Sequence, residues 1–283
     1  MKKLLTLLFP LLLVAGACSD AGAGDASESA DTTTTSAEGS TAESEAESSD
    51  DEPITVLVTN DDGVGAEGLC ALVEALDARD DVEVVVVAPA ENASATGGKT
   101  TGGQLQATQA TTASGYEATA VGGFPADAVI YALEQEGLEP DLVISGINDG
   151  QNIAQVVNIS GTVGAARQAA QLGVPALATS QGFGDPPDFP TAVELVMDWL
   201  DDNIAAIRDG SLGSDTISSL NVPTCPQGSI QGLVEVPVSS TEGDINAVDC
   251  AGTAEPTDDL TAFTNGWAAL TVLEPTGSIT EDG

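Results

Sequence analysis

The sequence predicts an α/β protein built on a mostly parallel sheet. Short apolar, β-branched segments alternate with segments of helical periodicity along residues 53–210. Such alternation is typical of strands joined by crossover helices. After Gly210 the pattern changes to short strands separated by turns, so residues 211–283 are predicted to form a strand-rich C-terminal segment. A hydrophobic fraction of 42% over 283 residues is enough for one sizeable core.

The first predicted elements form a strand–helix–strand unit. Ile54–Val58 is an apolar run and predicts a buried strand. Gly65–Ala78 predicts a helix, because its large apolar residues recur three and four positions apart. Val82–Ala88 is a second β-branched run, and Pro89 ends it.

Three further elements occupy the middle of the chain. Ala126–Gln135 predicts a helix, with Pro125 at a helix-start position. Leu142–Ser145 is an apolar run and predicts a buried strand. Gly161–Leu172 predicts a helix that opens on the small residues SGT.

The last helix of the α/β pattern precedes the strand-rich segment. Val174–Thr179 predicts a strand, and Ala192–Ile207 predicts a helix with a large apolar face. Beyond Gly210 the predicted strands are Ser218–Asn221, Ser229–Pro237 and Gly266–Leu273.

Charge and composition exclude several functions. The chain has 6 basic residues, 45 acidic residues and no histidine, which gives a formal net charge of −39. Such a surface repels nucleic acid polymers and anionic membranes, and it indicates an adaptation to solubility or salt. The absence of histidine excludes Ser-His-Asp and Cys-His catalysis and histidine-ligated zinc.

The N-terminus predicts export. Residues 1–18 combine two lysines, an apolar run and small residues before Cys18, the order of a signal peptide with a bacterial lipobox. We expect a lipid on Cys18 that anchors the protein to the outer face of the bacterial cell membrane. An ordinary signal peptide with a chance cysteine is the alternative. Residues 19–52 are acidic and rich in Ser, Thr and Ala, which predicts a disordered tether before the domain at 53–283.

Polar clusters follow the predicted strands, where open α/β sheets bind ligands. They are NDDG at 60–63, ENAS at 91–94 and SGINDGQN at 145–152, and NISGTVGAA at 158–166 opens a helix that could hold an anion. Adjacent carboxylates at 61–62 repel each other, and a hard divalent cation removes that repulsion. Oxygen ligands favour Mg, Mn or Ca. The alternative is that one aspartate simply caps the next helix.

The same segments carry a resemblance to a known family. Five segments carry it: TNDDGVGAEGL, VVAPAENASATGG, GGFPADAV, PDLVISGINDGQN and VNISGTVGAARQAA. In order and spacing they resemble the SurE family of survival-protein nucleotidases. The resemblance implies a Rossmann-like, three-layer sheet, a divalent cation (Mg or Mn) and hydrolysis of nucleoside monophosphates as a 5′/3′-nucleotidase. The implied metal ligands are Asp61, Asp62, Ser94 and Asn148. The implied phosphate-side residues are Asn60, Asn152, Ser160, Gly161 and Thr162.

The catalytic role falls to Asp61 or Asp62, which would orient water or accept its proton, since no histidine is available. Several departures from the family pattern alter the surroundings without removing a ligand. Phe124 replaces a threonine, Ala95 and Ala154 replace glycines, and the others are Glu67, Ala128 and Ile159. Two alternatives stay open. One is a lipoprotein that binds a nucleotide or metal without turnover, and the other is a phosphatase for polyphosphate or another phosphomonoester.

The C-terminal segment predicts two further features. The resemblance implies a homodimer or homotetramer assembled through this segment. Cys225 and Cys250 both lie in the turn-rich tail of a chain predicted to be exported, which favours a disulfide between them.

Overall fold

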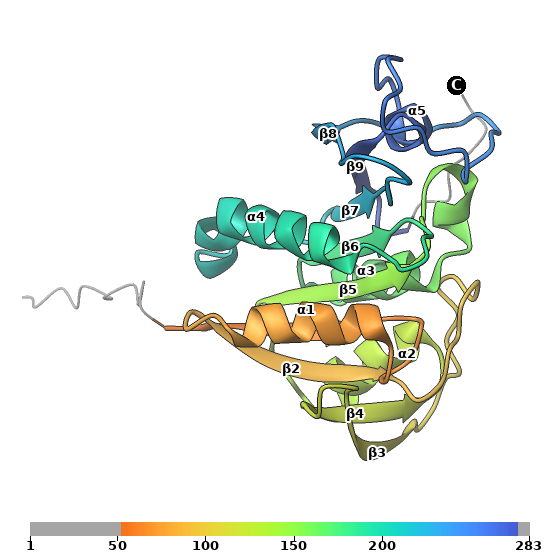
Figure 1. Cartoon of the computed structure of the whole chain (residues 1–283). Coiled ribbons are helices and arrows are strands. Elements are labelled where there is room, and N and C mark those ends of the chain that lie inside the picture. Colours follow the sequence, from red (N-terminus) through yellow and green to blue (C-terminus); the bar gives the residue numbers. More distant parts are fainter. Residues whose placement is uncertain (1–51, 277–283) are drawn as a thin grey trace, which may run out of the picture. The chain divides into compact units, whose positions relative to one another are not determined.

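The computed structural model describes residues 52–276, whose strands join in one nine-stranded sheet (Figure 1). The strand order is β3-β4-β2-β1-β5-β6-β7-β9-β8. The six central strands β4, β2, β1, β5, β6 and β7 run parallel to one another, which confirms the predicted mostly parallel sheet. Their bounds are β1 Ile54–Thr59, β2 Val82–Pro89, β3 Gln106–Thr111, β4 Glu117–Gly122, β5 Leu142–Asp149, β6 Ala176–Gln181, β7 Ile217–Val222, β8 Gly232–Glu235 and β9 Trp267–Leu273.

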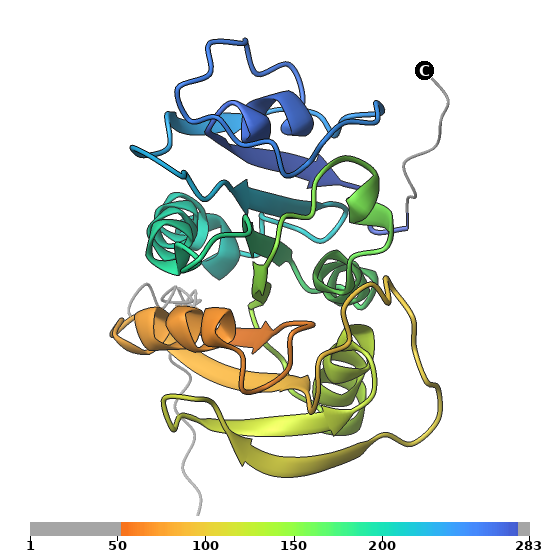
Figure 2. The ribbon, with the colours of Figure 1, turned by 45° about the vertical axis from the view of Figure 1, so that its right-hand side comes forward.

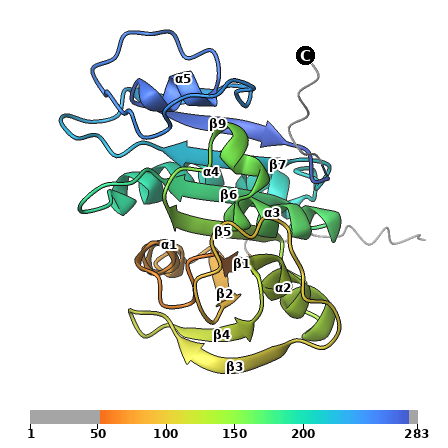
Figure 3. The ribbon, with the colours of Figure 1, turned by 90° about the vertical axis from the view of Figure 1, so that its right-hand side faces the viewer.

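Helices cover both faces of the sheet, which gives the three layers that were predicted (Figures 2 and 3). Helices α1 and α4 pack on one face against Val56 and Val58, and α2 and α3 pack on the other against Leu57. Side chains of a parallel strand alternate between two covered faces, so the strand reads as a continuous apolar run. The helices are α1 Glu67–Asp77, α2 Pro125–Ile130 with a π-helical continuation Tyr131–Gln135, α3 Gly161–Gln171, α4 Phe189–Arg208, α5 Asp259–Thr264 and a 3-10 turn Ala154–Asn158.

Four elements were not predicted: β3, β4, α5 and the 3-10 turn Ala154–Asn158. Strand β3 is an antiparallel edge strand with mostly exposed polar side chains, so it lacks the apolar alternation that identifies a strand. Strand β5 runs to Asp149, beyond its predicted end at Ser145, and so carries part of a polar cluster within a strand.

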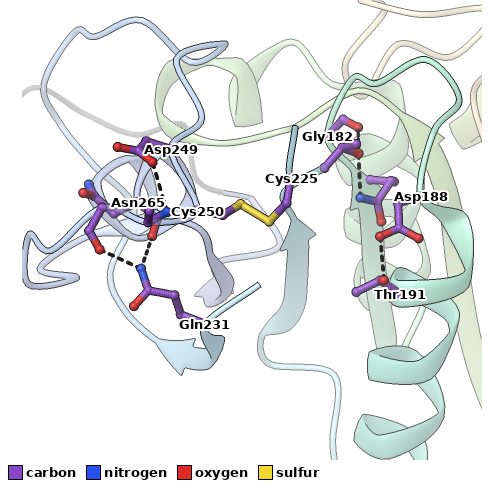
Figure 4. Close-up of a disulfide and its surroundings, with 12 residues drawn as sticks. Gly182, Asp188, Thr191, Cys225, Gln231, Asp249, Cys250 and Asn265 are labelled. Carbon is purple, nitrogen blue, oxygen red and sulfur yellow. Dashed lines mark hydrogen bonds between the residues drawn. A yellow bond between two sulfur atoms is a disulfide. The ribbon is translucent and has the colours of Figure 1, made fainter. Parts of the chain in front are cut away.

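The strand-rich C-terminal segment continues the same sheet. Strand β9 pairs antiparallel with β7, and β8 pairs with β9 at the edge. The predicted disulfide between Cys225 and Cys250 is confirmed (Figure 4). Beside it, the Gln231 side chain donates hydrogen bonds to the carbonyls of Gly252 at 2.8 Å and Asn265 at 2.6 Å. The bridge and these bonds hold the loops around β8 and α5 together.

The predicted signal peptide and nearly all of the predicted tether lie outside the described residues. Within residues 52–276 no helix combines the length and the apolar character needed to cross a bilayer.

Candidate active site

The polar clusters meet at the carboxyl ends of β1 and β5. Strand β1 pairs with β2 on one side and with β5 on the other, so the chain order reverses direction there. Open α/β sheets bind ligands in the crevice that forms at such a reversal. Figure 3 shows helix α3 beside these strands.

A tight turn after β1 presents the two carboxylates. The side-chain amide of Asn60 donates to the carbonyl of Gly63 at 2.9 Å and accepts from its N–H at 3.2 Å. Gly63 has a φ of 101°, and a Cβ there would lie 3.2 Å from the carbonyl carbon of Glu91. Asn60 therefore closes the turn, while its predicted contact with phosphate stays a prediction.

Asp61 points into the protein toward helix α3. The hydroxyl of Thr162 donates to Oδ1 of Asp61 at 2.7 Å, and Asp61 is only 3% exposed. A Cβ on Gly161 would lie 2.8 Å from Oδ2 of Asp61, so only glycine allows this close approach. Burial raises the pKa of Asp61 to about 6, the Thr162 hydroxyl opposes that rise, and the charge of Asp62 adds to it.

Asp62 turns toward the two neighbouring strand ends. Its Oδ1 accepts from the side-chain amide of Asn92 at 2.9 Å, and its Oδ2 accepts from the backbone N–H of Asp149 at 3.0 Å. Burial raises the pKa of Asp62, although the Asp149 N–H opposes it. The two adjacent aspartates thus bond to different segments, so the turn does not present them as a simple helix cap. Helix α1 indeed begins only at Glu67 and receives no side-chain cap.

The loop after β2 lies against the pair of aspartates. The N–H of Ala93 donates to the carbonyl of Asp61 at 2.7 Å, and the N–H of Ser94 donates to the side chain of Asn92 at 3.0 Å. The Ser94 residue is exposed. The loop therefore brings Ser94 next to the segment that holds both carboxylates.

Asn148 lies at the carboxyl end of β5, and Asn152 follows the strand. The Asn148 amide nitrogen donates to the carbonyl of Gly150 at 2.6 Å, which leaves its side-chain oxygen for a cation. The Asn152 amide nitrogen donates to the Ser180 hydroxyl at 2.8 Å, and the Asn152 N–H donates to the side chain of Asn221 at 2.7 Å. Asn152 also lies 3.5 Å from the Thr162 hydroxyl, so it adjoins the start of α3.

Residues 160–162, at the start of α3, are the predicted anion site. The Ser160 hydroxyl caps the helix by accepting from the N–H of Val163 at 3.1 Å. N–H groups in the first turn of a helix have no carbonyl partner in that helix, and the helix dipole favours an anion there. Thr162 links this anion site to Asp61, which the sequence did not predict.

Sequence reasoning missed several positioning residues. Asn92 belongs to the ENAS cluster at 91–94, but nothing in the sequence indicates that its side chain bonds to Asp62. The roles of Ser180 and Asn221 depend on β6 lying beside β5 and on β7 lying beside β6, which only the sheet order shows.

The residues fit a divalent cation. Asp61 is a buried carboxylate whose raised pKa reports a poorly stabilised anion beside a second carboxylate. A cation would relieve both effects, and carboxylate, hydroxyl and amide oxygens suit Mg or Mn. Within residues 52–276 no three His, Cys, Asp or Glu side chains gather into a metal cluster, so Ser94 and Asn148 would have to complete the set.

Comparisons with known proteins identify the relatives of this chain. The family model described as "Survival protein SurE" matches residues 56–242. A 5′-nucleotidase SurE of Halobacterium salinarum (strain ATCC 29341 / DSM 671 / R1) is 37% identical over 229 residues, which cover 78% of this chain and 81% of the relative. A 5′-nucleotidase SurE of Brevibacillus brevis is 35% identical over 190 residues, with coverage of 65% and 72%.

A solved structure is similar as well. The crystal structure of the SurE protein from Aquifex aeolicus matches with a TM-score of 0.64 and 28% identity, over 80% of this chain and 95% of that one. The fold and the names of the sequence relatives together support a nucleotidase or phosphatase activity.

Proposed function

This chain belongs to the SurE family, and we propose that it is a divalent-metal-dependent phosphatase that hydrolyses nucleoside monophosphates. One observation carries the proposal: the 2.7 Å hydrogen bond from Thr162 to Asp61. It places a carboxylate suited to a cation beside a helix start suited to a phosphate. A phosphomonoesterase needs both in one site.

Four residues would hold the cation: Asp61, Asp62, Ser94 and Asn148. When bound, Mg or Mn supplies positive charge next to a phosphoryl oxygen and acidifies water. Asp61 is held by Thr162, and Asp62 is held by Asn92 and the Asp149 N–H, so the turn keeps both carboxylates in fixed directions.

The remaining site residues would bind phosphate and move a proton. The N–H groups of Gly161 and Thr162 and the Asn152 amide would stabilise charge on the phosphoryl oxygens. Asp61 or Asp62 would orient the attacking water and accept its proton, since the chain has no histidine.

Phosphate release from purified protein tests the proposal. We expect AMP to release phosphate with Mg or Mn, and not with EDTA. Asp62→Asn should abolish release, and Asp149→Asn is the matched control, because Asp62 accepts from the backbone of Asp149 and not from its side chain. Metal binding without phosphate release would instead make the protein a binding lipoprotein. Release from polyphosphate and not from AMP would assign another substrate.

We also propose that the protein is exported and carries a lipid on Cys18. A Cys18→Ser protein should lose its membrane association in cell fractionation, while the wild type stays with the membrane. Unchanged fractionation of both proteins would exclude the anchor.

We further propose a homodimer or homotetramer assembled through the C-terminal segment. Its support is β8, an edge strand on which Leu233 is 41% exposed. Exposed apolar side chains on an edge strand favour pairing with another chain. Light scattering should show an oligomer that Leu233→Asp weakens, and a monomeric wild type would contradict this.

A further inference from the structure

A cavity adjoins the candidate active site. It measures about 610 Å³ and is lined by residues 90–94 and 96, which follow β2, and by residues 121–124, at the end of β4 and before α2. This volume is within the range of about 300–1,000 Å³ that small-molecule sites occupy. The cavity belongs to the same edge of the sheet as the two aspartates.

Two of its lining residues connect it to the site. Ser94 is a proposed metal ligand, and Asn92 holds Asp62 through its 2.9 Å hydrogen bond. A phosphate bound at the aspartates and the anion site would therefore have this cavity beside it. The group attached to that phosphate can extend into it.

The cavity wall has the chemistry of a site for a flat, uncharged ring. Phe124 contributes an aromatic side chain, and Gly122 and Gly123 present backbone without side chains. Among the described residues that line the cavity none is basic, and Glu91 adds a carboxylate. A second phosphate would meet that carboxylate without a cation, whereas a nucleobase can stack on an aromatic ring.

Phe124 is fixed in place at the start of α2. Its N–H donates to Oδ2 of Asp127 at 2.9 Å, and Pro125 follows it. Asp127 is in turn held by the N–H and hydroxyl of Thr101, at 2.8 and 2.6 Å. The residue is half-buried, yet it belongs to none of the apolar clusters described within residues 52–276. The backbone of Phe124 is therefore held at the cavity wall, and its side chain is not part of the described core.

We propose that this cavity binds the nucleobase of the substrate and that Phe124 stacks on it. The proposal rests on the proposed function for its link to catalysis, and it makes a nucleoside monophosphate, not polyphosphate or a simple sugar phosphate, the preferred substrate.

A competing position lies on the other side of the site. Phe183 is 63% exposed, and its ring lies against Gly150, because a Cβ there would meet it at 2.5 Å. The neighbouring cavity of about 640 Å³ is lined by residues 183–190 and 224–226, which include no proposed ligand. Phe183 is thus the matched control for Phe124.

Adenosine binding tests the proposal without turnover. Calorimetry on the full chain should show that adenosine binds, and that ribose binds far more weakly. Phe124→Ala should weaken adenosine binding about 5- to 150-fold, the range measured for loss of one base-stacking aromatic ring. Phe124→Tyr keeps a ring and should retain affinity, and Phe183→Ala should leave it unchanged. All variants should melt as the wild type does.

The outcomes separate this proposal from the proposed function. No adenosine binding, no effect of Phe124→Ala, or a loss confined to Phe183→Ala would each overturn the base site. Phosphate release from AMP is measured independently. Its absence, with adenosine still bound through Phe124, would overturn the phosphatase and leave the base site standing.

Discussion

The hydroxyl of Thr162 donates a 2.7 Å hydrogen bond to Oδ1 of Asp61, across a buried contact between residues 101 positions apart in sequence. The bond joins the first turn of α3 to the turn after β1. The anion site and the pair of aspartates therefore fix each other's position.

Removing this hydroxyl should impair catalysis. We expect Thr162→Val to lower kcat for AMP by about 10- to 100-fold, as loss of a group that orients a metal ligand does elsewhere. It should also destabilise the fold by about 1–3 kcal/mol, because a buried carboxylate loses its partner. Thr162→Ser keeps the hydroxyl and should retain most of the wild-type kcat and most of the wild-type stability. Wild-type kcat in Thr162→Val would show that the bond has no functional role.

The raised pKa of Asp61 predicts how metal-free stability depends on pH. The carboxyl ionises near 3.8 in the unfolded chain and at about 6 in the fold. Unfolding therefore releases a proton between these values, so the folded state loses stability as pH rises from about 4 to about 6. The loss amounts to about 3 kcal/mol at higher pH.

Urea unfolding in EDTA measures this dependence. Asp62 and Asp259 also have raised pKa values and act in the same direction, so the relevant quantity is the difference between wild type and Asp61→Asn. The wild type should lose more stability across this pH window than the variant. Parallel curves for the two proteins would show that Asp61 titrates normally.

Two alanines in left-handed backbone conformations predict different responses to glycine. Ala95 has a φ of 59° and is exposed, whereas Ala154 has a φ of 48° and is only 4% exposed. Relief of this conformation should stabilise Ala95→Gly by about 1 kcal/mol. Ala154→Gly should be near neutral, because it also loses a buried methyl group worth about 0.8 kcal/mol.

A third glycine variant is the control for these two. Ala113 is exposed and does not have positive φ, so Ala113→Gly should be neutral or slightly destabilising. Equal effects of Ala95→Gly and Ala113→Gly in urea unfolding would mean that backbone strain at Ala95 is not released.

The net charge of −39 predicts a stability that rises with salt. Like charges on one surface repel, and the screening length falls from about 10 Å at 0.1 M to about 3 Å at 1 M salt. Melting temperature should therefore increase by several degrees as potassium chloride rises over this range. A variant with fewer surface acids should show a weaker dependence of melting temperature on salt. Sucrose does not screen charge, so it should not distinguish that variant from the wild type. A melting temperature that is unchanged by salt would contradict this account.

The main strands and helices could be predicted because burial on both faces leaves a strong apolar pattern, as in β1 and β2. Strands β3 and β4 could not, because β3 has mostly exposed polar side chains and the buried side chains of β4 are small, two alanines and one valine. The bounds of β5 were wrong for a related reason: its last residues are polar and face the site.

The site was predictable as a set of residue types but not as a set of contacts. NDDG and SGINDGQN mark where ligands could lie, since they follow apolar strands. The bonds from Asn92 to Asp62 and from Thr162 to Asp61 depend on how β1, the loop after β2, and α3 converge in space. No periodicity in the sequence encodes that convergence.

Thermal melts with EDTA and with added Mg or Mn test the central claim most directly. Wild type should gain about 2.7 kcal/mol at a hundredfold excess of metal over its dissociation constant, and Asp61→Asn and Asp62→Asn should lose most of that gain. In EDTA the Asp61→Asn protein should be no less stable than wild type, because a repulsive buried charge is gone. If wild type and both variants respond identically to metal, the two aspartates do not bind it, and the account is contradicted.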